Sequence, residues 1–185
     1  MFRPIVFIVL SAAWVYVSRA SLRAPRFHGF YRFFAVEFIL ILILLNFANF
    51  EQWFAMRSLR QLASWFFLIA SVVAAVLGLY LLLASGRPEA ERRDDEQLIG
   101  FEKTTQLVTT GAYRYIRHPM YASLLFLAWG VFFKNPSWIA AGLALGATAF
   151  LVATARAEEV ENVRYFGATY EAYKQTTKMF VPFLF

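Results

Sequence analysis

Long apolar runs alternate with short polar segments along this chain, and the apolar runs predict membrane-spanning helices. A helix rises about 1.5 Å per residue, so it needs about 20 apolar residues to cross a bilayer core of about 30 Å. The first and fourth runs are short for this purpose, and the fifth is longer than the core requires. The five runs are Pro4 to Val17, Phe33 to Phe50, Leu62 to Leu83, Pro119 to Phe133 and Trp138 to Phe166. We therefore predict an all-α, polytopic integral membrane protein with about five transmembrane helices.

The polar segments divide this single predicted membrane domain into four parts. Gly86-Arg87-Pro88 is expected to stop the third helix, and Lys134-Asn135-Pro136-Ser137 to turn the last two helices into a hairpin. Gly167 is expected to close the fifth helix as a C-cap. The parts of the domain, which covers residues 1–185, are three spans in 1–84, a cytoplasmic loop and motif in 85–118, a helical hairpin in 119–166 and an interfacial tail in 167–185. Within the loop, the mixed charges of 89–96 predict a solvated segment.

The first apolar run has two interpretations. A short basic start and the small residues near Ser18 to Ala20 resemble a cleaved signal peptide, but Arg19 fits a cleavage site poorly. We predict a retained helix, which would need tilt or local bilayer thinning to span the membrane.

Composition supports a membrane protein, because 60% of the residues are apolar and only 16% are charged. The net charge of +6 comes from basic residues between the apolar runs. That distribution fits anionic lipid head groups and membrane orientation, and we expect no nucleic-acid partner. The absence of cysteine excludes disulfides, thiolate metal sites and cysteine nucleophiles. The two histidines lie far apart without metal-ligand spacing, so no metal site is predicted.

The basic residues also predict the orientation. With five spans, all of the 18 lysines and arginines except Arg3, Arg57, Arg60 and Lys134 fall on one side. The positive-inside rule then places the N-terminus outside and the C-terminus in the cytoplasm, across the inner membrane if the cell is bacterial. The polar motif before the fourth run and the acidic residues at the end of the fifth share the cytoplasmic side. We therefore expect them to form one composite site.

Leu107 to Tyr121 carries most of the polar and aromatic chemistry, with the sequence LVTTGAYRYIRHPMY. Pro119 suits the first position of a helix, and the residue before a proline is pushed out of the α region. The side chain of His118 would then lie beside the free N–H groups of the helix start, where an anion is favoured. With the neighbouring tyrosine rings, such a site suits a ligand that has a carboxylate, a flat ring and a cation. The alternative is a juxtamembrane belt, with Arg114 and Arg117 on lipid phosphates.

Other polar residues have simpler interpretations. Glu159 and Glu161 are expected to be solvated or paired with Arg156 and Arg164, and His28 to be an interface residue. The amphipathic tail around Tyr170 and Tyr173 is expected to lie along the membrane surface.

The C-terminal motifs resemble those of a known enzyme superfamily. GAYRYIRHPMY, then Glu158-Glu159, then FGATYEAY and a terminal proline are similar to the isoprenylcysteine carboxyl methyltransferase and phospholipid N-methyltransferase superfamily of integral membrane enzymes. The resemblance covers about Leu107 to Pro182, and the first hundred residues agree only in being membrane spans.

The resemblance implies S-adenosylmethionine as the cofactor and a pocket built from these C-terminal elements. Glu158 would take the amino group of the cofactor, and no catalytic residue is assigned. An activated methyl group mainly requires alignment of donor and nucleophile; a carboxylate or thiolate acceptor needs no general base, whereas an amine must first be neutral. The residues expected to contact the cofactor are Thr105, Gln106, Leu107, Val108, Tyr113, His118, Pro119, Met120, Tyr121 and Glu158.

One position departs from the resemblance. The carboxyl methyltransferases of this superfamily place an arginine one helical turn before the first glutamate to hold the substrate carboxylate, but Thr154 stands there. Arg156 lies about 200° further around the helix. It is the candidate substrate-binding residue if the helix is distorted, and otherwise pairs with Glu159.

We therefore expect a methyltransferase that acts on a lipophilic small molecule or a lipid, which enters through a lateral opening between helices. A sterol-reductase-like membrane enzyme is a rival and predicts arginines for the phosphates of NADPH, although no Gly-rich phosphate loop is present. A lipid-binding or assembly protein without turnover is the second rival. The acceptor atom, whether oxygen, nitrogen or sulfur, and the oligomeric state stay open.

Overall fold

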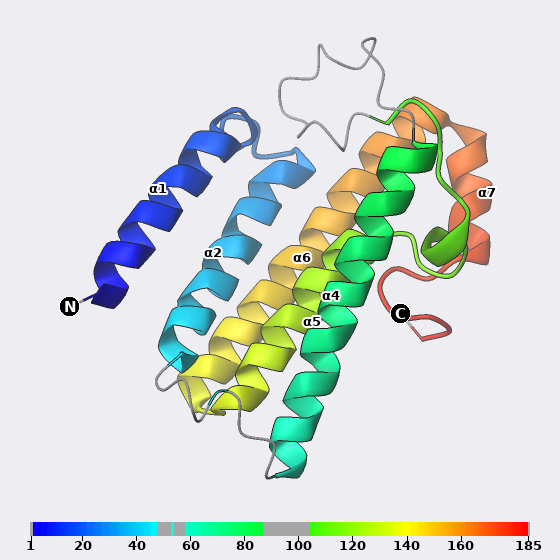
Figure 1. Cartoon of the computed structure of the whole chain (residues 1–185). Coiled ribbons are helices and arrows are strands. Elements are labelled where there is room, and N and C mark those ends of the chain that lie inside the picture. The colour runs from blue at the N-terminus through cyan, green and yellow to red at the C-terminus, as the bar shows by residue number, and fades with distance from the viewer. Residues whose placement is uncertain (1, 48–52, 54–57, 87–103, 185) are drawn as a thin grey trace.

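The computed structural model of the chain describes residues 2–47, 53, 58–86 and 104–184. Its ordered elements in these ranges are helices, and an isolated β-bridge outside them joins Ile116 and Lys178. The helices are α1 (Phe2–Leu22), α2 (His28–Asn46), α4 (Leu59–Ser85), the short 3-10 helix η3 (Gly111–Arg114), α5 (Pro119–Lys134), α6 (Trp138–Phe166) and α7 (Ala168–Thr176). Figure 1 shows the five long helices side by side. The all-α membrane fold is thus confirmed.

Four of these helices are long and apolar enough to cross a membrane, and α5 is shorter at 16 residues. The first candidate span covers Arg3–Leu22, so the expectation of a short first span is wrong. Ser18 and Ser21 are buried, and the helix continues through them. The second helix begins at His28, earlier than expected, and ends at Asn46. Residues 48–50 of that predicted run, Arg57, and the predicted solvated segment 89–96 lie outside the described residues.

Local sequence signals account for the helix ends. Ser58 caps α4 by accepting a hydrogen bond from the N–H of Gln61, and Ser137 caps α6 by accepting one from Ala140. The expected turn at Lys134 to Ser137 therefore separates α5 from α6. Gly167 ends α6 with φ of 60°, a left-handed conformation that suits glycine.

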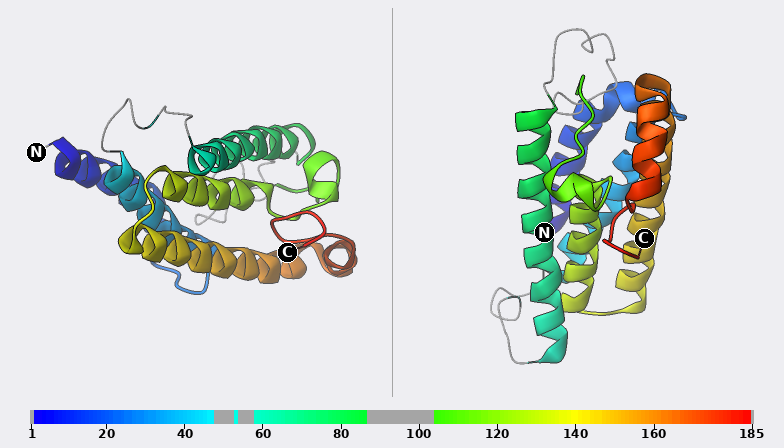
Figure 2. Two further views of the ribbon diagram at one scale, coloured as in Figure 1. Left: turned by 90° about the horizontal axis from the view of Figure 1, so that it is seen from below. Right: turned by 90° about the vertical axis from the view of Figure 1, so that its right-hand side faces the viewer.

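Small and polar residues bring the helices together. Ser64, Ser71 and Gly78 are the buried small residues of α4, spaced seven apart, and the Ser64 hydroxyl donates to the Gly130 carbonyl at 2.7 Å. On the other side of the bundle, Asn46 of α2 donates to the Val131 carbonyl at 2.8 Å. Such close approaches and interhelical hydrogen bonds are typical of helix packing in membranes. Figure 2 shows α5 between α4 and α6.

The short α5 creates space at one end of the bundle. In Figure 1, α5 starts well below the upper ends of α4 and α6, near which α7 lies. After α7 the chain returns beside the segment that precedes α5. The N–H of Arg117 donates to the Lys178 carbonyl at 2.8 Å, and the N–H of His118 donates to Met179 at 3.2 Å. The C-terminal segment therefore fixes His118 at the start of α5, with φ of −124° and ψ of 62°.

Candidate functional site

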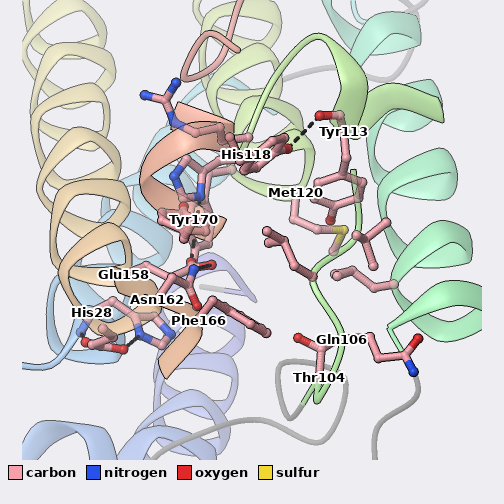
Figure 3. Close-up of a pocket in the computed structure, with 17 residues that line it drawn as sticks. His28, Thr104, Gln106, Tyr113, His118, Met120, Glu158, Asn162, Phe166 and Tyr170 are labelled. Atoms are coloured by element: carbon pink, nitrogen blue, oxygen red, sulfur yellow. Dashed lines mark hydrogen bonds and ion pairs between the residues drawn. The ribbon is translucent and has the colours of Figure 1, made fainter. Parts of the chain in front are cut away.

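A cavity occupies the end of the bundle that α5 leaves open. It encloses about 770 Å³ of empty space when its open mouth is counted. Figure 3 shows that its walls come from α2, α4, the loop before η3, the start of α5, α6 and α7. Elements far apart in sequence thus converge on one space.

Most residues of the predicted cofactor site line this cavity. Thr105 and Pro119 do not: the Thr105 N–H donates to the Gly86 carbonyl at 3.1 Å, and Pro119 is buried. A Cβ atom on Gly78 of α4 would lie 3.2 Å from Pro119, so glycine permits this close approach. Thr104 lines the cavity next to the predicted loop residues. The predicted residues that do line it are Gln106, Leu107, Val108, Tyr113, His118, Met120, Tyr121 and Glu158.

His118 and Glu158 meet at the start of α5, as the composite site requires. Their closest atoms, Nδ1 and Oε2, are 3.8 Å apart, and His118 is only 4% exposed. The imidazole stacks on Tyr121 with ring centroids 5.5 Å apart, and Tyr121 lies beside Glu158. The Glu158 side chain keeps 28% of its surface exposed. It is a positioned carboxylate that faces open space.

The expectation for Glu159 is wrong, because this residue is buried and its partners come from other elements. Its carboxylate lies 2.7 Å from Arg117 Nε, 2.9 Å from Lys174 Nζ and 3.4 Å from His118 Nε2. Arg117 lies in the segment before α5, and Lys174 lies on α7. Arg117 also donates to the carbonyls of Lys174 and Thr177. The Arg117–Glu159 ion pair therefore holds the C-terminal segment against the cavity wall.

His28 and Glu161 also differ from expectation. His28 is buried and lines the cavity, with its Nδ1 atom 2.6 Å from Glu161 Oε2 and its backbone N–H 2.9 Å from Glu161 Oε1. The expectation of an interface histidine and a solvated glutamate is therefore wrong. It failed because α2 begins at His28, which brings its first turn to the end of α6. With Glu158 and Asn162 these two residues form a polar corner of the cavity. Figure 3 shows His28, Glu158 and Asn162 on the same side of the cavity.

The tail tyrosines turn inward instead of lying on the outer surface. Tyr170 and Tyr173 are buried and line the cavity, and the Tyr173 hydroxyl donates to the Tyr113 carbonyl. Burial raises the pKa of Tyr113 and Tyr170 well above the ordinary value, and the nearby Glu158 carboxylate raises both further. These phenols therefore stay protonated at neutral pH. Tyr170 and Tyr173 are three residues apart, so they lie on one face of α7. This spacing can be read from the sequence.

Arg156 lies apart from the cavity. Thr154 is fully buried and its hydroxyl donates to the Phe150 carbonyl at 2.7 Å, whereas Arg156 is exposed and does not line the space. The α6 helix thus keeps the roughly 200° separation of a regular helix. A role of Arg156 in binding substrate stays a prediction.

The cavity has two chemically different sides. Leu82, Leu107, Val108 and Met120 give it an apolar wall opposite the polar corner, and aromatic rings lie between. This arrangement fits a ligand with a charged amino-acid-like end and an apolar or aromatic end. Within the described ranges, no group of three histidine, cysteine or acidic side chains is placed to hold a metal ion.

A comparison with protein families agrees with this geometry. Residues 93–169 match the family model described as phospholipid methyltransferase. The match includes the RHPMY motif, the Glu158-Glu159 pair and the start of α7, and it confirms the resemblance seen in the sequence. No curated protein and no solved structure matches the chain.

Proposed function

We propose that this chain is an integral membrane methyltransferase that uses S-adenosylmethionine to methylate a lipophilic or membrane-embedded acceptor. Its residues 93–169 match the phospholipid methyltransferase family model. The family match supports a membrane methyltransferase. The cofactor and the acceptor class are the further steps of the proposal.

One observation carries the proposal. Eight of the ten residues expected to contact the cofactor line a single cavity, although they come from the loop before η3, from η3, from α5 and from α6. A juxtamembrane belt would instead turn these aromatic and basic side chains outward toward lipid. Tyr113, His118 and Tyr121 are buried here and face a common space.

The residues present suit the proposed cofactor. Glu158 is the carboxylate that would hold its ammonium group, and His118 and Tyr121 keep that carboxylate in place. The rings of Tyr113 and Tyr170 offer faces that attract a cation, and Leu107 and Val108 offer an apolar wall. When bound, this cofactor supplies a methyl group on a sulfonium, which is already activated for displacement. The chain's own task is to orient the reactants and exclude water.

The acceptor is proposed to enter from the bilayer. The cavity wall includes Leu82 at the end of α4 and His28 at the start of α2, above the point where α5 begins. An opening between these helices would admit an apolar molecule from the side, while the cofactor arrives from water. Glu161 and His28 lie where they can accept a proton if the acceptor is an amine.

The reductase alternative is less well supported. Arg117 is the one arginine among the described residues that line the cavity, and it is already bonded to Glu159 and to two carbonyl oxygens. No lining cation in the described part of the chain is left for the phosphate of NADPH. A lipid-binding protein without turnover predicts the same cavity and is separated from an enzyme only by a search for product.

Calorimetric binding of S-adenosylmethionine and of NADPH to the detergent-purified chain tests the proposal. We expect the methyl donor to bind, and His118→Ala and Glu158→Ala to weaken this binding strongly. Glu171→Ala removes an exposed carboxylate of α7 and is the matched control, with unchanged affinity expected. Binding of NADPH alone would reject the proposal in favour of a reductase.

We also propose that the cavity faces the cytoplasm, because most basic residues would then lie inside. The chain contains no cysteine, so Gln175→Cys near the cavity and Asn135→Cys at the other end are single-thiol reporters. A membrane-impermeant maleimide applied to intact cells should label Asn135→Cys and leave Gln175→Cys unlabelled until the membrane is opened. The reverse pattern would invert the proposed orientation.

A further inference from the structure

A second hollow lies on the outer face of α6 and shares Glu161 with the cavity. Two shallow, open depressions adjoin here and share Arg164. Arg156, Val160 and Arg164 follow one another at spacings of four residues, so they lie on one face of the helix. Arg26 and Phe27 of the α1–α2 connection border one side of the hollow, and Lys174 of α7 borders the other. We call this surface, made by Arg26, Phe27, Arg156, Val160, Arg164 and Lys174, the basic groove.

The charge of the basic groove is strongly positive. Arg26, Arg156 and Arg164 are exposed, and none of them has a carboxylate partner within the described residues. Glu159 and Glu161 also border the groove, but Glu159 binds Arg117 and Lys174, and Glu161 binds His28. Lys174 stays 36% exposed despite its ion pair. The groove therefore presents several cations to an anionic ligand.

The length of α6 places the groove at the depth of the lipid head groups. The helix has 29 residues, about 44 Å at about 1.5 Å per residue, and so exceeds a bilayer core of about 30 Å by nearly half. Trp138 at its start is 95% exposed, as suits an aromatic side chain at the opposite interface. Twenty residues from Trp138, the helix leaves the core close to Arg156. Arg156 and Arg164 then lie where phosphates of the membrane lie.

Apolar side chains accompany these cations. Val160 is 53% exposed between Arg156 and Arg164, and Phe27 lies at the other edge of the groove. A free phosphate ion has no apolar surface to pack against such side chains, whereas a phospholipid can place its glycerol backbone and acyl chains beside them. The combination favours a lipid over a soluble anion.

We propose that the basic groove binds the phosphate of an anionic phospholipid, with the apolar part of the lipid over Val160 and along the outer face of α6. The groove is distinct from the cofactor cavity, because Arg156 and Arg164 do not line that cavity. The proposal does not depend on the methyltransferase activity.

Native mass spectrometry of the delipidated chain in detergent tests this proposal, with phosphatidylglycerol and phosphatidylcholine as the two probes. We expect one phosphatidylglycerol to bind more tightly than any further copies, and more tightly than phosphatidylcholine. The double variant Arg156→Gln/Arg164→Gln should lose affinity by about fivefold for each cation removed. Both arginines are exposed, so the variant should unfold at the temperature of the unmodified chain.

The matched control is Arg19→Gln/Arg23→Gln, which removes two exposed arginines at the same end of the bundle but outside the groove. We expect this control to keep full affinity for phosphatidylglycerol. An equal loss in the control would overturn the proposal in favour of diffuse surface charge. Equal binding of phosphatidylcholine, or displacement of the lipid by millimolar inorganic phosphate, would also overturn it.

Discussion

The two ends of α5 hold polar groups in opposite ways. At its start, His118 and Glu158 face a cavity, and Glu158 keeps over a quarter of its side chain exposed. At its end, Lys134 is only 4% exposed, and its ammonium group donates to the Trp53 carbonyl at 2.8 Å and to Gln61 Oε1 at 3.2 Å. The same ammonium lies 4.1 Å from the centroid of the Trp65 ring.

This difference separates a site from a structural cluster. Buried polar groups that satisfy one another stabilise the fold, and leaving one without its partner is costly. Polar groups arranged around open space gain little stability from that arrangement and are suited to a ligand. From this comparison we propose that the start of α5 serves binding and that its end serves packing. Four substitutions test the distinction.

Substitution of Arg117 should have the largest effect on stability and binding together. Arg117 lines the cavity and also belongs to a buried structural cluster. Arg117→Gln leaves the buried Glu159 without its closest partner and releases two carbonyls of the C-terminal segment. We expect the free energy of unfolding to fall by about 3 kcal/mol, and cofactor affinity to fall with it. Denaturation followed by tryptophan fluorescence, together with calorimetric binding, measures both. Unchanged stability would mean that the tail is not held in this way.

Glu158→Gln should change binding and not stability. The substitution keeps the size of the side chain but removes its charge, so the proposed charge-assisted contact with the cofactor ammonium would be lost. We expect affinity to drop by roughly 10- to 100-fold, as for a contact of about 1.5–3 kcal/mol, with little change in unfolding. Glu171→Gln on α7 is the control. A stability loss without a binding loss would remove Glu158 from the site.

Lys134→Met should give the opposite result. It leaves the Trp53 carbonyl and Gln61 without their donor and removes a cation from the face of Trp65. The free energy of unfolding should fall by about 1–3 kcal/mol, whereas the Kd for the cofactor stays within about twofold. Lys178→Met removes an exposed lysine and should change neither quantity. A selective loss of cofactor binding in Lys134→Met would contradict the assignment of Lys134 to a structural cluster.

The smallest effect is expected from Tyr173→Phe, which removes only the hydrogen bond to the Tyr113 carbonyl. The unfolding free energy should fall by about 1 kcal/mol, and Tyr113 should become easier to ionise as its surroundings loosen. A spectrophotometric titration of the tyrosines at alkaline pH would detect this as an earlier transition. An unchanged titration and unchanged stability would show that α7 is held by other contacts.

Local sequence signals predicted the helices and several of their ends. Hydropathy and turn residues are local signals, so the helices, the Pro119 start and the Gly167 end were predictable. The meeting of His118 with Glu158 followed from their placement on one side of the membrane. Periodicity also predicted that Arg156 and Thr154 lie on different faces of α6, as they do.

Partners between distant elements were not predictable in the same way. Glu159 pairs with Arg117 and Lys174 because the tail folds back, and nothing within a few residues of Glu159 indicates that return. His28 reaches the cavity because α2 starts one turn earlier than the apolar run suggests. The packing of helices decides such contacts, and the local pattern of a single helix does not contain them.

Transfer of a labelled methyl group tests the proposed methyltransferase activity most directly. The purified chain would be placed in vesicles of mixed phospholipids and supplied with methyl-tritiated S-adenosylmethionine, and the organic extract would be counted. We expect tritium in a lipid-soluble product with the unmodified chain and a large loss of it with Glu158→Gln. Tight binding of the methyl donor without any labelled lipid, in bacterial or eukaryotic lipid extracts, would contradict the proposal that this protein methylates a lipophilic acceptor.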